Sequence, residues 1–266
     1  MKEKLSITLD RKTVAKVDGI IDNLVIRNRS QAIEYLIDNA IGDNKKAVIL
    51  AGGPEHMQAF GQGDYRVTAP IGKSTLIELA LKKLRESGFT DIFVVAPHKV
   101  LTRIFDLVRD GEPYDVRITY VEENTPRGTA HSLKLVKGRI SENFLVVYGV
   151  LVFQNINLDE LWNQHLRSNS MATLMLTTSA KPSEKGTVVM EGSRVLSFVQ
   201  KPKKSDIYLV FSPIFAAKPE LLQQDGDSLE YDIFPRLAVK GLLGGHLSSE
   251  KEIHIYRRED IKLVRA

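Results

Sequence analysis

The sequence predicts an α/β protein in which a small strand-helix-helix segment precedes a large domain built around a sheet. Strand-like and helix-like segments alternate from residue 48 to residue 147, which is typical of a mostly parallel mixed sheet with helices on both faces. An apolar run at residues 47–50 leads to the pair Gly52 and Gly53, which indicates a buried strand followed by a loop open to close backbone approach. Before residue 45 the apolar spacing indicates a different, smaller unit.

Composition limits the classes of protein. The 266 residues are 43% hydrophobic and 26% charged, as in an ordinary globular chain. We expect neither a membrane span nor a signal peptide, and therefore a cytoplasmic location, because no run of about 18 apolar residues and no charged-then-apolar leader is present. Without cysteine there is no disulfide, no thiolate nucleophile and no Cys-based zinc site. The formal charge of +4 permits nucleic-acid binding without requiring it.

The first element is a predicted strand over residues 2–10. Apolar side chains at positions 5, 7 and 9 alternate with Lys4, Ser6 and Thr8, which is the period of two of a strand with one wettable face. Two helices are expected to follow, the first capped by Asp10 and the second capped by Ser30. A unit of this size buries little by itself, so it is expected to need a partner.

The pattern of residues 2–42 resembles the ribbon-helix-helix DNA-binding domain, in which two chains pair their strands as an antiparallel ribbon. The resemblance implies a homodimer or higher even oligomer whose ribbon enters the major groove of double-stranded DNA. Lys4, Ser6 and Thr8 would then contact base edges, while Arg29 and Ser30 would offer a cation and amide donors to a phosphate. In the alternative interpretation, the segment is only a dimerisation arm with a solvated polar face.

The large domain is expected to begin at residue 45, so that the chain divides into residues 1–44 and 45–266. Its predicted strands cover residues 48–50, 92–96, 117–121 and 144–147, and its predicted helices cover residues 75–87, 100–109 and 130–137. Ligands of such sheets bind at the carboxyl ends of the strands, where the loops carrying Gly52, Gly53 and Gly128 would lie.

Four segments in order, at residues 47–53, 123–131, 144–149 and 198–202, together resemble the sugar-phosphate nucleotidyltransferases. That family makes nucleotide sugars from an NTP and a sugar 1-phosphate, and the resemblance extends from about residue 46 to the C-terminus. It implies a Rossmann-like nucleotidyltransferase domain. It also implies a ligand pocket that includes Leu50, Ala51, Gly52, Gly53, Arg66, Glu123, Gly128, Thr129 and Lys201.

Three charged residues have implied roles in that pocket. Glu123 stands where the family often has a base-reading glutamine, and a carboxylate suits the N1 and N2 hydrogens of guanine. Lys201 matches a lysine that meets the sugar phosphate. Arg66 replaces a lysine and keeps its charge.

At several positions the sequence departs from the pattern of that family. The family's phosphate-gripping loop arginine is Met57 here, and Glu55 adds an anion to the same loop. The two aspartates that hold magnesium in the family correspond to Val150 and His254, and neither suits Mg²⁺. We therefore expect no catalytic residue, no metal ligand and no cofactor in a domain that keeps the fold and senses a nucleotide or nucleotide sugar.

Taken together, these patterns predict a DNA-binding transcriptional regulator with a catalytically inactive nucleotidyltransferase-like domain. The alternative is an active, Mg²⁺-dependent sugar-1-phosphate nucleotidyltransferase that recruits Glu122, Asp206 or Asp232 as metal ligands and uses its N-terminal arm for assembly or autoregulation. A third interpretation is purely structural, with a large domain that binds no ligand.

Overall fold

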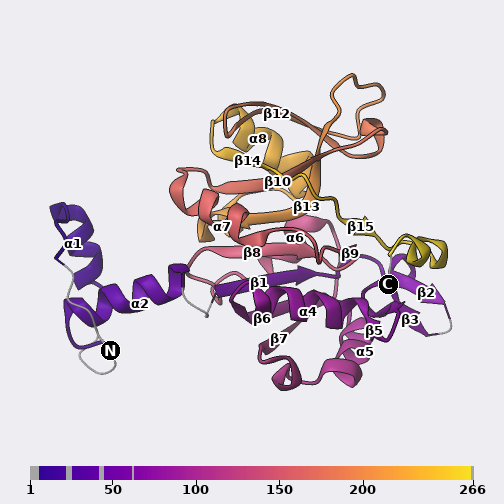
Figure 1. Ribbon diagram of the computed structural model, residues 1–266, viewed down its shortest axis with the longest axis horizontal. Helices are drawn as coiled ribbons and strands as arrows, with labels where there is room; N and C mark the ends of the chain where they lie inside the picture. Colours follow the sequence, from indigo (N-terminus) through magenta and orange to yellow (C-terminus); the bar gives the residue numbers. More distant parts are fainter. Residues whose placement is uncertain (1–5, 22–25, 42–44, 62, 265–266) are drawn as a thin grey trace. The chain divides into compact units, whose positions relative to one another are not determined.

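The structure is a computed structural model that describes residues 6–21, 26–41, 45–61 and 63–264 (Figure 1). The chain divides into two compact units, Met1–Asp43 and Asn44–Ala266. The first unit contains helices α1 (Arg11–Asp18) and α2 (Arg29–Ile41).

Both helices of the first unit begin at a side-chain cap. Asp10 caps α1 as predicted, because its carboxylate accepts hydrogen bonds from the amides of Lys12 and Thr13. The cap of α2 is Asn28, whose Oδ1 accepts from the Gln31 amide at 3.0 Å. The predicted cap, Ser30, lies inside the helix.

The predicted strand at residues 2–10 is not observed where the chain is described. Ser6 and Thr8 are exposed and belong to no strand, while residues 2–5, Lys4 among them, lie outside the described residues. A strand is held by hydrogen bonds to a neighbouring strand, and the described part of the chain pairs no strand with residues 6–10.

The second unit is built on a sheet with nine strands among the described residues, in the order β10-β14-β12-β11-β13-β8-β1-β6-β7 (Figure 1). In chain order these are β1 (Lys45–Leu50), β6 (Phe89–Ala96), β7 (Arg117–Glu122), β8 (Phe144–Tyr148), β10 (Ala172–Thr178), β11 (Gly186–Glu191), β12 (Arg194–Gln200), β13 (Leu209–Ala217) and β14 (Leu243–Leu247).

The two halves of the sheet differ in strand direction. Strands β7, β6, β1 and β8 run parallel, as predicted. Strand β13 then pairs antiparallel with both β8 and β10, and β11 pairs antiparallel with β12. The sheet is therefore mixed, and the prediction of a mostly parallel sheet fits only its first half. The turn of Gly192 and Ser193 is too short to allow a parallel connection between β11 and β12.

Helices cover both faces of this sheet. Helices α4 (Leu76–Glu86), α5 (His98–Val108) and α7 (Leu158–Arg167) pack on the face that includes Ala47 and Ile49. Helices α6 (Thr129–Lys134) and α8 (Phe234–Val239) pack on the opposite face with Val48 and Leu50. Alternate residues of β1 thus point into two separate cores, as expected of a central strand.

Smaller elements surround the sheet. They are helix α3 (Glu55–Gln58), the strand pairs β2 (Ala59–Gly61) with β3 (Asp64–Tyr65), β4 (Pro70–Ile71) with β5 (Ser74–Thr75), and β9 (Leu151–Val152) with β15 (Ile253–His254), and the 3₁₀ turns η1 (Arg66–Thr68) and η6 (Arg258–Leu263). The β9–β15 pair attaches a late segment of the chain directly after β8. Ile255 then enters a third apolar cluster with Phe60, Ile71 and Leu76.

An aromatic cluster encloses the first residue of β1. The rings of Phe89 and Trp162 meet edge to face, with centroids 5.2 Å apart. Lys45 Nζ lies 5.3 Å from the Phe89 centroid and 5.9 Å from that of Trp162. The ammonium also donates to the Ser87 carbonyl at 3.0 Å and pairs with Asp159 at 3.1 Å. These contacts offset the free-energy cost of burying the charged lysine side chain.

Candidate active site

A cavity of about 320 Å³ lies at the carboxyl ends of the parallel strands, as the sheet rule predicts. Leu50, Gly52, Gly53, Gly128 and Thr129, which the sequence indicated, are among its lining residues. Further lining residues were not predicted: Pro54, Pro126, Arg127, Ser132 and Tyr148. The cavity therefore lies between the end of β1, the start of α6 and the end of β8.

The glycine pair is required by close contacts beside the cavity. A Cβ on Gly52 would lie 2.4 Å from Glu123 Oε2, a distance that no side chain can adopt without displacing the carboxylate. Gly53 has a φ of 103°, in the region that glycine adopts most readily. The loop therefore has its shape because both residues lack a side chain.

Glu123 is buried beneath this loop, with only 2% of its surface exposed. Its Oε2 accepts a hydrogen bond from the Gly53 amide at 2.6 Å, and its Oε1 accepts from the Ser132 hydroxyl. The carboxylate thus ties the glycine loop to α6, while Ala51 lies buried behind the loop. Each oxygen retains a second lone pair.

A second buried carboxylate, Glu230, accepts hydrogen bonds from two residues that line the cavity. Tyr148 Oη donates to Glu230 Oε1 at 2.5 Å, and Thr129 Oγ1 donates to Glu230 Oε2 at 2.6 Å. Burial, reinforced by the charge of Glu230, raises the pKa of the Tyr148 phenol well above its ordinary value. Tyr148 therefore stays a hydrogen-bond donor and fixes the end of β8 to α6.

Two predicted cations lie outside the cavity lining. The Arg66 guanidinium lies over the Tyr256 ring, 5.3 Å from its centroid. Within the described part of the chain, the buried Arg66 Nε has no hydrogen-bond acceptor. Lys201 is exposed and has a φ of 46°. The predicted roles of both residues in phosphate binding stay predictions.

The structure brings together Val150 and His254, the two positions that the resemblance matched to magnesium ligands. The Ile255 amide donates to the Val150 carbonyl at 2.8 Å, and His254 pairs with Leu151 between β15 and β9. Val150 nevertheless offers no ligand atom. The ring nitrogens of His254 lie 2.9 Å from Glu252 Oε1 and 3.0 Å from Tyr256 Oη.

The three carboxylates considered as replacement metal ligands do not gather in one place. Glu122 lies 3.2 Å from His98 Nδ1, Asp232 accepts from the amides of residues 227 and 228, and Asp206 is exposed in a loop. In the ranges that the structure describes, no group of three or more His, Cys, Asp or Glu residues could hold a metal ion. The described residues therefore do not fit a protein-held magnesium site.

Glu252 forms an ion-pair cluster next to the magnesium positions. Its side chain is 1% exposed, and its Oε1 lies 3.2 Å from Lys185 Nζ. Burial alone would raise the pKa of Glu252, but the hydrogen bond from His254 and the charge of Lys185 outweigh it and lower the pKa to about 2. Glu252 therefore stays ionised.

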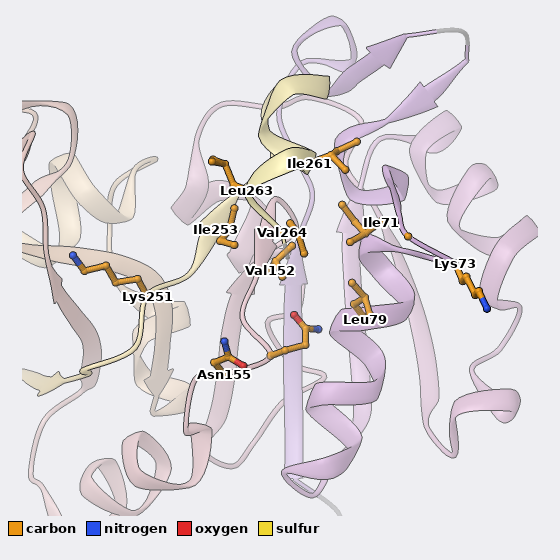
Figure 2. A pocket seen from close by; sticks show the side chains of 12 residues that line it. Ile71, Lys73, Leu79, Val152, Asn155, Lys251, Ile253, Ile261, Leu263 and Val264 are labelled. Carbon is orange, nitrogen blue, oxygen red and sulfur yellow. The ribbon is translucent and has the colours of Figure 1, made fainter. Parts of the chain in front are cut away.

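A second, larger cavity of about 580 Å³ has a different character (Figure 2). Apolar side chains such as Ile71, Val152 and Ile253 surround it, and the ammonium groups of Lys73 and Lys251 point away from it (Figure 2). Because neighbouring residues of a strand point to opposite sides, β15 presents Ile253 to this cavity and His254 to the other side. An apolar cavity of this kind does not suit phosphates.

None of the helices in the described ranges is long and apolar enough to cross a membrane.

The family model described as nucleotidyl transferase matches residues 46–235 of this chain. A Sulfolobus acidocaldarius protein assigned as a mannose-1-phosphate guanyltransferase is 28% identical over 200 residues, which covers 73% of this chain and 54% of that protein. The mannose-1-phosphate guanyltransferase of Aspergillus fumigatus is 27% identical over 214 residues, or 74% of this chain and 57% of the relative. The chain therefore spans somewhat more than half the length of these two relatives.

A solved structure shares the fold. It is assigned as a glucose-1-phosphate thymidylyltransferase from Bacillus anthracis, and it superposes with a TM-score of 0.72. The match covers 82% of this chain and 93% of that chain at 16% sequence identity. The likeness extends to the architecture of the mixed sheet and its helices.

The prediction of a DNA-binding transcriptional regulator with an inactive sensor domain is wrong. The names of the matching proteins indicate sugar-1-phosphate nucleotidyltransferases, which was the alternative interpretation. The residues expected to bind DNA do not form a ribbon where they are described: Ser6 and Thr8 belong to no strand, and Arg29 is paired with Asp18 at 2.6 Å. The short amphipathic segment at the start of the chain was a weaker indication of function than the pattern of the large domain.

Proposed function

This chain belongs to the nucleotidyl transferase family, and on that premise we propose that it is an active sugar-1-phosphate nucleotidyltransferase. In this reaction, a phosphate oxygen of the sugar 1-phosphate attacks the α-phosphorus of an NTP. The new P–O bond forms as the bond to the β-phosphate breaks, and pyrophosphate leaves with its electron pair. The nucleotide that was expected to act as an effector is then a substrate.

The single observation that carries this proposal is the glycine-loop cavity above the buried Glu123. Gly52 and Gly53 let a nucleoside approach the backbone, and Glu123 holds the Gly53 amide in place at 2.6 Å. The sequence suggested that Glu123 reads guanine, but its carboxylate is buried and lies outside the cavity lining, so it shapes the loop rather than contacting the base. The guanyltransferase names of the relatives support guanine as the base, so we propose GTP and mannose 1-phosphate as the substrate pair.

In this proposal, the rate also depends on the positioning of the two substrates and on cationic side chains that stabilise phosphate charge. Arg127 lines the cavity, with its Nη2 2.9 Å from His131 Nδ1, and it can approach the triphosphate. Arg66 and Lys201 lie outside the cavity lining, and in this proposal they supply further positive charge to the phosphates. Holding two reactants in line and stabilising phosphate charge are the main sources of rate in nucleotidyl transfer, and neither requires Met57 to be an arginine.

A direct assay tests the proposal. The purified full chain is incubated with each NTP and with mannose 1-phosphate or glucose 1-phosphate, and both pyrophosphate and nucleotide sugar are measured. We expect GDP-mannose as the main product. Glu123→Ala should lower kcat/KM by about tenfold or more, because it removes a buried acceptor from the loop. Glu122→Ala, at the neighbouring carboxylate beside His98, is the matched control. Absence of product with every pair of substrates would overturn the proposal.

A further inference from the structure

A row of five side chains occupies the place where the nucleotidyltransferases hold magnesium. This charged row consists of Lys185, Glu252, His254, Tyr256 and Arg66. Lys185 Nζ lies 3.2 Å from Glu252 Oε1 and 3.5 Å from His254 Nε2. His254 Nδ1 lies 3.0 Å from Tyr256 Oη, and Arg66 lies 5.3 Å from the Tyr256 ring centroid. The row thus has a cation at each end.

The charged row lies close to the glycine-loop cavity. Gly149, the residue before Val150, donates its amide to the carbonyl of Leu50 at 2.8 Å, and Leu50 lines that cavity. The Ile255 amide is also bonded to the Val150 carbonyl, two residues after Tyr148 in the chain. Phosphates that extend from a nucleoside in the cavity can therefore reach the row.

The charges of the row repel a metal ion and attract a phosphate. Its only carboxylate, Glu252, is already paired with Lys185. Arg66 and Lys185 would both repel a divalent cation at the position beside Val150. Arg66 Nε is buried and, among the described residues, has no acceptor, so the guanidinium has a donor that no described residue uses.

We propose that Arg66 and Lys185 neutralise the phosphate charge of the substrates in place of a divalent cation held by the protein, and that Glu252 positions Lys185 and His254 for this purpose. The choice of GTP and mannose 1-phosphate as ligands rests on the proposed function. Lys185 gives one of its three donors to Glu252 and keeps two for a phosphate. Glu252 is a positioning residue, because its buried carboxylate contacts the lysine and the histidine.

The first experiment measures metal binding to the full chain without substrate. Mn²⁺ is titrated and followed by electron paramagnetic resonance. We expect no stoichiometric binding to the unaltered protein. The double variant Val150→Asp with His254→Asp restores two carboxylates at adjacent positions and is expected to acquire a site. Stoichiometric Mn²⁺ binding to the unaltered chain would overturn the proposal.

The second experiment measures ligand binding in EDTA by calorimetry. The unaltered chain is expected to bind GTP and mannose 1-phosphate without any metal. Lys185→Gln should weaken binding of mannose 1-phosphate by about tenfold or more, because a charge-assisted contact is lost. Lys181→Gln, an exposed lysine of the same loop, is the matched control. Glu252→Gln should weaken binding less than Lys185→Gln, since it leaves the cation in place but no longer holds it.

The outcomes separate this inference from the proposed function. Binding in EDTA that depends on Lys185, with no turnover, supports the inference and overturns the function. The other result is turnover, with ligand binding that requires Mg²⁺ and is unchanged in Lys185→Gln. That result supports the function and overturns the inference.

Discussion

His165 illustrates how one buried side chain gives the stability of this protein a pH dependence. The imidazole is fully buried on α7, and its Nδ1 lies 2.9 Å from Thr173 Oγ1. Burial, with a smaller contribution from the charge of Lys218, lowers the pKa of His165 to about 4. The histidine is therefore neutral in the folded protein near neutral pH.

The first prediction concerns the free energy of unfolding between pH 7 and pH 4. The unfolded chain protonates His165 near its ordinary pKa of about 6.5, while the folded chain protonates it only near pH 4. Stability is thus fully present above pH 6.5 and falls as the pH drops toward 4, by on the order of 3 kcal/mol. Urea unfolding at pH 7 and pH 5 measures this loss.

His165→Gln should flatten that dependence, whereas His56→Gln, at an exposed histidine, should leave it unchanged. Glu252 affects the free energy of unfolding in a different, more acidic pH range. Its folded pKa of about 2 lies below the ordinary value, so its contribution is present above about pH 4.5 and is lost as the pH falls through 2. An unaltered slope between pH 7 and pH 5 in His165→Gln would contradict the assignment.

At the scale of elements, the late segment around β15 determines where the charged row lies. Ile255 is fully buried in the cluster with Phe60, Ile71 and Leu76, and its amide bonds to the Val150 carbonyl. The packing of one isoleucine thus holds His254 and Glu252 beside the position of Val150.

The second prediction compares two isoleucines of this segment. Ile255→Ala should lower the free energy of unfolding by about 2–5 kcal/mol, because it leaves a cavity in a closed cluster. Ile253→Ala should cost clearly less, since Ile253 is only half-buried and lines an existing cavity. Chemical denaturation of both variants gives the comparison, and equal losses would show that the cluster does not anchor the segment.

The parallel half of the fold was predictable because its signals are local. Strands β1, β6 and β8 each contain a short apolar run, and β7 is a mixed strand with apolar residues at positions such as Ile118 and Val121. Gly52, Gly53 and Gly128 lie in the loops that form the cavity. Strands β11 and β12 also contain apolar residues, but some of these, such as Val189 and Leu196, are exposed, so the sequence pattern does not report how the strands are buried. Their direction depends on pairing with β13, which no local pattern reports.

The contacts that complete the site were missed because they join residues that lie far apart in the chain. Tyr148 and Glu230 are 82 residues apart in the chain, and Lys185 and Glu252 are 67 apart. Neither pair forms a motif with a fixed spacing. Glu123 was identified from its place before Gly128, but its bond to the Gly53 amide appears only in the fold. The added anion Glu55 and the lost cation Met57 were interpreted as loss of activity. Arg66 was identified from the sequence, whereas the contact of Lys185 with Glu252 appears only in the fold.

At the scale of the whole molecule, the first unit exposes apolar side chains that its own residues do not cover. Val17 and Ala32 are its buried hydrophobic residues in the described ranges, whereas Leu36 and Ile37 on α2 are 42% and 44% exposed. A unit of about 40 residues seldom folds without further support. We therefore expect a second copy of this chain to cover α2.

The third prediction is a homodimer or higher even oligomer in solution that depends on this face. Leu36→Asp should yield monomers, because it places a charge in a buried apolar contact. Val239→Asp, at an 83% exposed valine of the second unit, is the control and should leave assembly intact. Light scattering after size exclusion measures the mass. A monomeric unaltered chain would contradict the prediction.

The aromatic cluster at the start of β1 has a spectroscopic consequence. Trp162 is the only tryptophan of the chain, and its indole is 1% exposed against Phe89 and Lys45. When light that tyrosine does not absorb is used for excitation, the intrinsic fluorescence therefore comes from one indole in an apolar setting next to the Lys45 ammonium. Its emission maximum therefore reports, without any label, whether the start of β1 is packed against Phe89 and Trp162. The emission can also be followed while substrate is added.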